Sequence, residues 1–410
     1  MHPPVHTVSQ RLYFLDWVRI LAFFVLIAYH VGMYYVSWDW HVKSPHASEA
    51  PEPFMLLSSP WRLTLLFFVA GAASHFLLAR LGPGKFVRRR SLRLLAPLVF
   101  GMLVIVPPQP YLEVVEKLGY ADSYLAFMRL YIVGYDGFCR EDCLSLPTWN
   151  HLWFVLYLWV YTLVLAAGVA LLGETRIAAL ARRLGTALDG WRLILLPVLF
   201  LGIIRILLLD RFPQDHSLTN DWYNHATYLP TFVLGALLAR TPRIWDTMAE
   251  QRWTALCLAL ASWAAIVLWF AAPHETMAPH DMERWRSGMR FVYALCAWGA
   301  IVAACGFARR RLNRDGPARR YLTDAVFPVY IAHQTLIVVM AHAFKPLHLA
   351  PGLEAILLML LTATGSFALY EAVRRVPLMR PLFGLAFQPR AVDAGADTDP
   401  RARRVGTAHV

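Results

Sequence analysis

The sequence is poor in charged residues. Asp, Glu, Lys and Arg make up 16% of its 410 residues, whereas a typical soluble domain has about 25%. Hydrophobic residues make up 58% of the chain, and the mean hydropathy is +0.45. This composition excludes an ordinary soluble domain and predicts an all-α integral membrane protein that crosses the bilayer several times.

Cysteines and the common signature motifs are also scarce. Five cysteines are too few for a disulfide-stapled scaffold. Cys139 and Cys143 lie in an expected outward loop, where they could pair in an oxidising compartment, and the spacing leaves that question open. The chain has no P-loop, G-x-G-x-x-G, G-x-S-x-G or H-E-x-x-H, and no Cys/His spacing typical of a metal site. These absences argue against an ATPase, a Rossmann enzyme, an α/β-hydrolase and a zincin, and we expect neither a metal nor a permanently bound cofactor.

Apolar segments of the length that crosses a bilayer core of about 30 Å recur along the chain. Prolines 97, 197, 230 and 328 lie inside or at the ends of these segments, which membrane helices tolerate when neighbours satisfy the backbone. The sequence predicts ten transmembrane helices in one domain over residues 1–385, followed by a basic, disordered cytoplasmic tail over 386–410. The expected spans are 12–36, 61–79, 92–108, 151–172, 191–209, 226–240, 253–272, 288–307, 321–343 and 352–373.

Basic residues alternate between the two sides of these spans. The termini and the loops after the even-numbered spans hold 27 of the 39 lysines and arginines. Basic residues concentrate in cytoplasmic loops, so both termini are expected in the cytoplasm. The same rule accounts for most of the net charge of +12 without a nucleic-acid partner.

The outward loops mix aromatic, acidic and histidine side chains. They cover residues 37–60, 109–150, 210–225 and 273–287. Aromatic residues at this depth are typical of the interfacial belt of a membrane protein. Aromatic faces beside carboxylates and amides also suit a carbohydrate, so both interpretations remain open.

The first apolar segment, residues 11–36, contains Asp16, Arg19 and His30. A charged side chain at the centre of a membrane helix costs about 2.5–3.5 kcal/mol, so such residues mark functional sites by default. Arg19 and His30 are eleven residues apart, which places them on nearly the same side of a helix and roughly 16 Å apart along its axis. A lone histidine is more often structural, but two costly residues on one face favour a shared cavity in which His30 is a general base or nucleophile. Asp16 is expected to neutralise Arg19 as an ion pair.

A second basic cluster, FVRRRSLRLLAP at residues 86–97, marks the cytoplasmic entry to the third span. Anchoring by the positive-inside rule explains part of it. Arg90 and Arg93 are three residues apart and share a helix face, and guanidinium groups match phosphate oxygens bidentately. The alternative to anchoring is therefore a phosphate site for a cytoplasmic metabolite.

Three further polar spots interrupt or border the apolar spans. Each pair of residues is more often structural than catalytic when it stands alone. They are Asn150 with His151, Tyr330 with His333, and Tyr370 with Glu371.

The motifs resemble the membrane acyltransferase-3 family. Arg19, ten residues and His30 are similar to its R-x10-H motif, and Arg90-x-x-Arg93 to its R-x-x-R motif. Further segments resemble, in order, the branch of that family that modifies periplasmic glucans: FFVAG at 67–71, HLWFVL at 151–156, YLPTFVLGAL at 228–237, VYIAHQTL at 329–336 and LYEAVRRVPLMRPLF at 369–383. One departure is His333-Gln334, where that branch has two histidines, and it could alter the substrate.

The resemblance implies a ten-helix enzyme of the bacterial inner membrane. Such an enzyme would move a succinyl or acetyl group from cytoplasmic acyl-CoA to a hydroxyl of a periplasmic glycan, beside other glucan-biosynthesis proteins. His30 becomes the catalytic residue and Arg19 its partner. The acyl-CoA site would comprise Arg88, Arg89, Arg90 and Arg93. We take Asp16, His151, Tyr330, His333 and Glu371 as supporting residues.

Two other functions would also place charges inside the membrane. One is a transporter or flippase of an acylated or anionic glycan precursor, in which Arg19 and His30 would line a permeation path. The other is a non-catalytic subunit that anchors a glycan-synthesis complex. The ordered acyltransferase motifs, and the absence of a recognisable inverted repeat, favour the enzyme.

Overall fold

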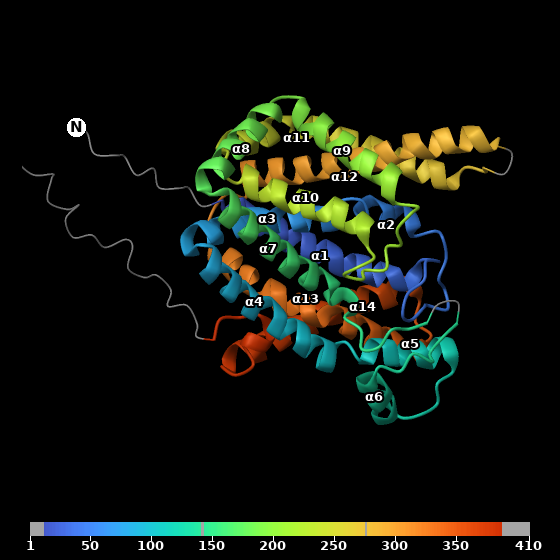
Figure 1. Ribbon diagram of the computed structural model, residues 1–410. Coiled ribbons are helices and arrows are strands. Elements are labelled where there is room, and N and C mark those ends of the chain that lie inside the picture. Colours follow the sequence, from blue (N-terminus) through green and yellow to red (C-terminus); the bar gives the residue numbers. More distant parts are fainter. Residues whose placement is uncertain (1–11, 141–142, 275–276, 388–410) are drawn as a thin grey trace, which may run out of the picture.

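The computed structural model of the protein describes residues 12–140, 143–274 and 277–387, and every regular element in these ranges is a helix (Figure 1). The tail expected over 386–410 lies almost wholly outside the described residues. In order, the helices are α1 (Tyr13–Tyr35), α2 (Glu52–Ser58), α3 (Arg62–Leu81), α4 (Pro83–Phe100), η1 (Gly101–Ile105), α5 (Pro108–Leu118), α6 (Tyr124–Val133), η2 (Asn150–Leu152), α7 (Trp153–Leu172), α8 (Glu174–Ala187), α9 (Arg192–Leu208), α10 (Trp222–Leu238), α11 (Pro242–Ala271), α12 (Pro279–Arg311), α13 (Pro317–Phe344), η3 (Lys345–Leu347), α14 (Pro351–Arg375) and η4 (Pro381–Phe383).

Eight helical segments within the described residues are long and apolar enough to cross a membrane, and the bent pair of α8 and α9 raises the number to nine. The sixth expected span corresponds to α10, which has 17 residues and contains the polar residues Asn224 and His225 in its first turn. It nevertheless packs against α3 and lies beside α7. The chain is therefore a multi-pass membrane protein, while the count of ten spans and the cytoplasmic termini remain predictions.

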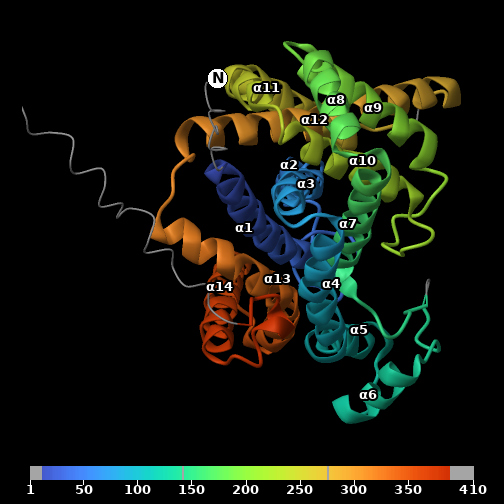
Figure 2. The same ribbon diagram turned by 60° about the vertical axis from the view of Figure 1, so that its left-hand side comes forward.

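Helix α1 lies at the centre of the bundle, as Figures 1 and 2 show. It packs against α2, α3, α12, α13 and α14. Phe14 at its start and Tyr34 near its end are both fully buried. A central helix is enclosed by neighbours rather than lipid, which is where intramembrane charges are tolerated.

The third span begins earlier than the apolar pattern predicts. Helix α3 ends at Gly82, whose φ of +73° is accessible to glycine, and α4 starts at the next residue, Pro83. The basic cluster 86–97 is therefore part of α4 itself and not a loop at its entry. After Pro97 the helix widens into the π-helical turn η1, closed by a 2.8 Å hydrogen bond from the Val106 amide to the Gly101 carbonyl.

The outward segment 109–150 is more ordered than a loop. It contains most of α5 and all of α6, and Cys139 and Cys143 are joined by a disulfide. Phe127, Tyr131 and Phe138 form a small buried cluster of their own there. Some aromatic residues of the outward segments thus pack against one another in a local core. These residues form neither an interfacial belt nor a carbohydrate surface.

Helices α3 and α10 touch through their backbones. A Cβ atom on Gly71 would lie 1.8 Å from the carbonyl oxygen of Phe232, and one on Gly235 would lie 2.0 Å from that of Phe68. Both positions therefore require glycine, and the contact is reciprocal.

Candidate active site

The two costly residues of the first helix lie on one unbroken helix, since α1 runs from Tyr13 to Tyr35. At a rise of about 1.5 Å per residue, Arg19 and His30 are separated by roughly 16 Å along its axis, as expected. The two residues have different surroundings, which we describe in turn.

His30 is paired with His333 of α13. The His30 Nδ1 and His333 Nε2 atoms are 2.7 Å apart, and the His333 Nδ1 is 2.5 Å from the carbonyl oxygen of Tyr330. A carbonyl only accepts hydrogen bonds, so in the neutral pair His333 carries its proton on Nδ1 and accepts on Nε2. His30 must then donate from Nδ1, which leaves the lone pair on His30 Nε2. This is the nitrogen that can take a proton from a substrate or attack a carbonyl.

Two of the expected supporting residues complete this cluster. The His151 ring packs edge-on against the His333 ring at 5.3 Å, and its Nε2 lies 3.1 Å from the Ile331 carbonyl oxygen. The Tyr330 hydroxyl donates to the carbonyl of His151. His151 of η2 and Tyr330 of α13 thus pack around His333, the partner of His30.

A hydrogen-bonded network lies beside the cluster, and most of its members could not be recognised from the sequence. Gln109 accepts from Asn150 at 2.9 Å and Gln334 at 3.0 Å, and donates to His151 at 3.4 Å and to Thr335 at 2.7 Å. All four of its hydrogen-bonding positions are used.

Gln334 extends the network outward. Its amide nitrogen lies 3.1 Å from His41 Nε2, and His41 Nδ1 lies 2.5 Å from a carboxylate oxygen of Glu113. Gln334 is the residue at which this chain departs from the double histidine of the related branch. Its amide provides two donors on one nitrogen, which a second neutral histidine could not.

Arg62 is the residue beside His30 that the sequence analysis missed. It is 7% exposed, and its Cζ lies 3.2 Å from the centroid of the Tyr29 ring. Within the described residues it forms no salt bridge, and its Nε and Nη1 atoms have no hydrogen-bond partner. The sequence does contain a signal for Arg62. It lies at the outward end of the expected span 61–79, the side on which the positive-inside rule predicts fewer basic residues.

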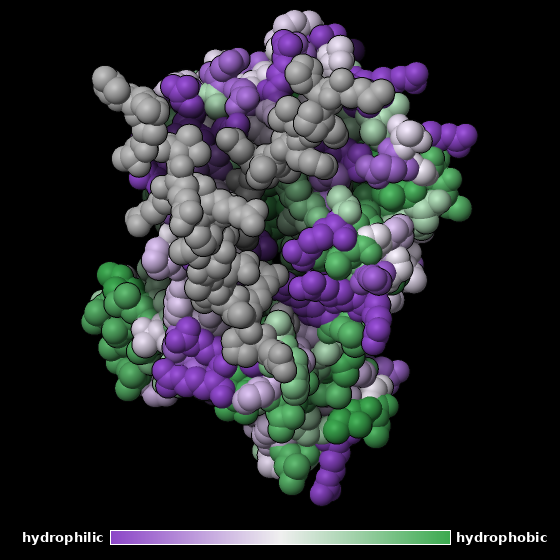
Figure 3. Space-filling model, turned by 90° about the vertical axis from the view of Figure 1, so that its left-hand side faces the viewer, coloured by the Kyte–Doolittle hydropathy of each residue, from purple (hydrophilic) through white to green (hydrophobic). Residues whose placement is uncertain are grey.

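The N-terminal end of α1, which we call the inner end, lies in a cluster of cationic side chains. Arg90 donates to the Ser74 hydroxyl at 2.6 Å, and the like charges of Arg19 and Arg93 both act on it. Figure 3 looks at this end of the molecule, where hydrophilic side chains gather between apolar flanks. Arg88 and Arg89 are exposed on the same helix. The structure therefore brings Arg90 within reach of the charges of both Arg19 and Arg93, while Arg88, Arg89 and Arg93 are exposed.

Asp16 forms the expected ion pair with Arg19, in which Arg19 Nη2 lies 3.5 Å from Asp16 Oδ1. Its other oxygen accepts a shorter hydrogen bond from Arg319. Arg319 is 2% exposed and also donates to Asp315 at 2.6 Å. Hydrogen bonds from Arg320 and Arg319 hold the pKa of Asp315 well below its usual range. Asp16 is therefore shared between Arg19 and a buried arginine on α13, so it neutralises Arg19 only in part.

Glu371 lies apart from His30. It accepts from Tyr321 at 2.9 Å and pairs with Arg374 and Arg375 at the inner end of α14. The outer end of that helix is fixed by Glu354, which accepts a 2.9 Å hydrogen bond from Tyr35 at the end of α1. The separation of seventeen positions places Glu371 roughly 25 Å from Glu354 along the helix, so it cannot support the histidine cluster directly.

The arrangement combines a base with an available nitrogen, a buried cation beside it and a cationic cluster at the other end of the helix. No group of His, Cys, Asp and Glu suited to a metal ion occurs among residues 12–140, 143–274 and 277–387. These are parts that an acyl transfer between a thioester and an alcohol requires: a base, a cation near the developing oxyanion and a place for phosphates.

Comparison with known proteins agrees with this chemistry. Residues 12–371 match the acyltransferase domain of the acyltransferase-3 family. The chain is similar to glucans biosynthesis protein C of Escherichia coli strain K12, and to the same protein of Escherichia coli O81 strain ED1a. Both are 24% identical over 395 residues, which cover 92% of this chain and 94% of theirs. No solved structure gives a significant match to the chain. The chain therefore belongs to the acyltransferase-3 family of membrane proteins, whose members transfer acyl groups.

Proposed function

We propose that the protein is an O-acyltransferase of the bacterial inner membrane that moves a succinyl or acetyl group from cytoplasmic acyl-CoA to a hydroxyl of a periplasmic glucan. The observation that carries the proposal is that one helix holds Arg19 in a cationic cluster at its inner end and His30, with Nε2 available, near its outer end. The name of the relatives points to a glucan as the acceptor.

The inner cluster supports the choice of donor. Coenzyme A carries several phosphates, and guanidinium groups bind phosphate oxygens in pairs. Arg90 and Arg93 would hold these phosphates, with Arg19 facing the same anion. The thioester must then extend roughly 16 Å along α1 to reach His30, a distance comparable to the pantetheine arm.

The histidine pair supports the chemical step. The His30 Nε2 takes the proton of the glucan hydroxyl while the oxygen attacks the thioester carbonyl, forming the new C–O bond. When the C–S bond breaks, the thiolate takes the proton back from His30 and leaves as a thiol. Arg62 would stabilise the negative oxygen between these steps. The alternative is a relay in which His30 Nε2 first carries the acyl group itself.

The test is genetic and chemical. Deleting the gene is expected to remove an ester from periplasmic and envelope glycans, read by mass spectrometry. The wild-type chain should restore it, and His30→Ala or Arg19→Ala should not, at equal protein level. Full ester content in the His30→Ala strain would contradict the assignment of His30 and would favour the scaffold or transporter function.

The relay has its own test. The purified protein is incubated with radiolabelled acyl-CoA and no acceptor, then denatured. Label on the peptide that contains His30 supports the relay. A chain without label, together with kinetics that require both substrates at once, supports direct transfer.

A further inference from the structure

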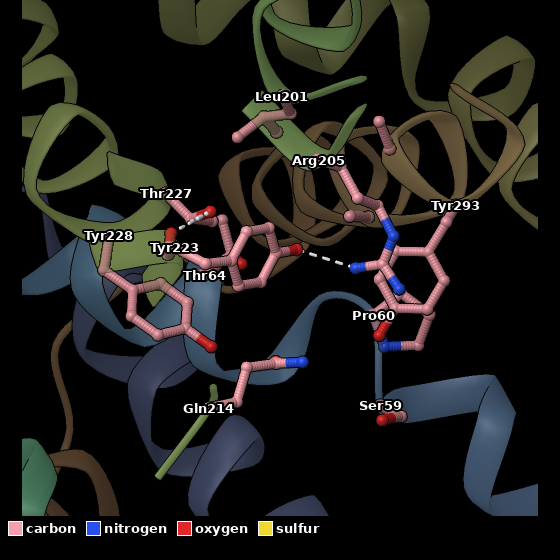
Figure 4. A pocket seen from close by; sticks show the side chains of 12 residues that line it. Ser59, Pro60, Thr64, Leu201, Arg205, Gln214, Tyr223, Thr227, Tyr228 and Tyr293 are labelled. Atoms are coloured by element: carbon pink, nitrogen blue, oxygen red, sulfur yellow. Dashed lines mark hydrogen bonds between the residues drawn. The ribbon is translucent and has the colours of Figure 1, made fainter. Parts of the chain in front are cut away.

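A second polar site lies on the outer side of the bundle, between α3, α9, α10 and α12. It is a cavity of about 50 Å³, and Figure 4 shows the side chains that line it. Arg205, Gln214, Tyr223, Thr227, Tyr228 and Tyr293 contribute most of its polar atoms. A cavity of this size, with several polar partners, suits a small hydrated or charged group.

Arg205 is the charged group of this cavity. Its Cζ lies 3.6 Å from the centroid of the Tyr293 ring, and its Nη1 donates to the Tyr223 hydroxyl at 2.7 Å. Figure 4 shows the guanidinium lying along the Tyr293 ring, with Gln214 directed into the same space. The ring fixes the plane of the guanidinium, so its remaining N–H groups point in fixed directions.

Arg62 is a second cation near this cavity, although its own side chain is not among the lining residues. The cavity is lined by Pro60 and Thr64, which flank Arg62 in sequence, and the charge of Arg62 acts on both Tyr228 and Tyr293. Two of its nitrogen atoms are buried and lack hydrogen bonds within the described part of the chain. Taking an arginine out of water without a counter-ion or full hydrogen bonding costs several kcal/mol, so a partner outside the protein is expected.

The nearby carboxylates have partners of their own. One oxygen of Asp221, at the start of α10, accepts from Tyr157 at 2.7 Å and from Asn224 at 2.8 Å, while its other oxygen is buried without a hydrogen bond within the described residues. Asp210, at the end of α9, pairs with Arg290. Neither Arg62 nor Arg205 forms a salt bridge with any residue that the structure describes.

We infer that Arg205 binds a carboxylate group of a substrate in this outward cavity, and that the charge of Arg62 adds to the attraction. A planar carboxylate matches the fixed donor edges of a stacked guanidinium, and the volume suits a group of that size. The carboxylate has two possible sources, which share this chemistry: the free end of a dicarboxylic acyl group, or an acidic sugar of the acceptor. The choice of source rests on the proposed function, whereas the binding site itself does not.

The first experiment measures binding alone. The full chain in lipid nanodiscs is titrated with succinate, and with succinamide as its uncharged counterpart. Succinate should bind and succinamide should not, and Arg205→Gln and Arg62→Gln should each weaken succinate at least about 10-fold, the scale of a lost charged hydrogen bond. Arg290→Gln, an outward arginine that has its own carboxylate, should bind succinate as the wild type does.

Several outcomes would overturn the site. They are no binding of succinate to the wild type, equal binding by all three variants, or a loss in Arg290→Gln as large as that in Arg205→Gln. If Arg62→Gln does not fold, the half-buried Arg205 carries the same comparison, and Arg62→Lys should bind succinate because it keeps the charge.

The second experiment separates the sources. With a neutral glucan acceptor, a site for the acyl group predicts that Arg205→Gln lowers kcat/KM with succinyl-CoA at least about 10-fold and leaves acetyl-CoA within about 2-fold. A site for the acceptor predicts an equal loss with both donors, seen only on a carboxylated glucan. No change in either arm would contradict a role in substrate binding. Succinate binding without any transferase activity would instead refute the proposed function and leave the carboxylate site intact.

Discussion

The two ends of α1 use polar groups in opposite ways. At the inner end, Arg19 and Arg93 act on Arg90 as like charges, and the carboxylate of Asp16 is shared between Arg19 and Arg319. At the outer end, neutral imidazoles are held by backbone carbonyls and amides, and His30 has one nitrogen left over. The inner end is therefore suited to binding an anion, and the outer end to moving a proton.

The comparison explains why the outer end needs more protein around it. An unpaired charge near the surface can be solvated, whereas a buried polar group must be hydrogen-bonded by the fold. The four hydrogen bonds of Gln109 and the bridge through Gln334 meet this requirement around the histidines. Substitutions at the two ends should accordingly change different kinetic constants.

The largest effect is expected from His30→Ala. Removal of a general base typically costs about 10²–10⁴-fold in rate, so kcat should fall by that amount while the KM for acyl-CoA stays unchanged. Transfer assays on purified protein measure both constants. His46→Ala, at an exposed histidine of an outward loop, is the matched control and should keep wild-type activity. A rise in KM without a fall in kcat would break the division between the two ends.

Arg90→Gln should produce the converse result. Loss of one charged hydrogen bond to a phosphate weakens binding by roughly 10–100-fold, so the KM for acyl-CoA should rise while kcat changes little. High salt should reduce the difference between the variant and the wild type. Arg89→Gln, an exposed arginine of the same helix, should change KM less than about 2-fold. Equal effects of both substitutions would reduce the inner cluster to a membrane anchor.

His333→Ala sharpens the account of the outer end. His333 positions His30 and touches no substrate in this scheme, and loss of such an orienting partner typically costs about 10–100-fold. We expect kcat to fall within that range, a shift of the pH–rate profile, and an unchanged KM for acyl-CoA. A structural defect alone would lower the amount of active protein and leave the pH profile where it was.

The smallest effect on activity is expected from Lys43→Met. Lys43 donates to the carbonyls of Met33 at 2.7 Å, of Trp38 at 2.9 Å, and of Val36. It therefore ties the outer end of α1, and its loss should lower the unfolding free energy by roughly 1–3 kcal/mol without changing kcat. Thermal unfolding in detergent measures the loss.

The stability difference between the wild type and Lys43→Met should also depend on pH. Burial lowers the pKa of Lys43 from 10.5 to about 8, so between these values the unfolded chain binds more protons than the folded one. The stability of the wild type relative to Lys43→Met should thus rise as the pH increases through that window. A constant difference would show that the ammonium group is not held as described.

The first helix could be predicted in detail from its residues. The apolar length, the positions of Arg19 and His30 and their shared side follow from the local chain alone, and α1 agrees with them. The early start of α4 could not be predicted, because Gly82 and Pro83 resemble an ordinary loop until the close turn between two helices is seen. The apolar pattern reports depth in the membrane, and it does not report where a polar helix continues beyond it.

The candidate active site could be predicted from the sequence only in part. His333 was identified as polar within a span, but its bond to His30 joins residues 303 positions apart. Periodicity places residues on one helix face, and it does not say which helix lies opposite. Arg62 could not be predicted, since nothing local shows that its guanidinium would lie on a tyrosine ring close to a cavity. The distance of Glu371 from His30 could not be predicted either, because nothing local shows that its partners would be Tyr321, Arg374 and Arg375.

The backbone contact between α3 and α10 has a mechanical consequence. Gly71 and Gly235 leave no space between the two helices, so their axes cannot move closer there. Arg62 lies at the outer end of α3, and Tyr223 and Tyr228 lie on the outer half of α10. A relative rotation of the two helices would therefore pivot about the glycine contact. A small rotation there would widen or narrow the outer space between α3 and α10, while the inner halves of the two helices would move in the opposite direction.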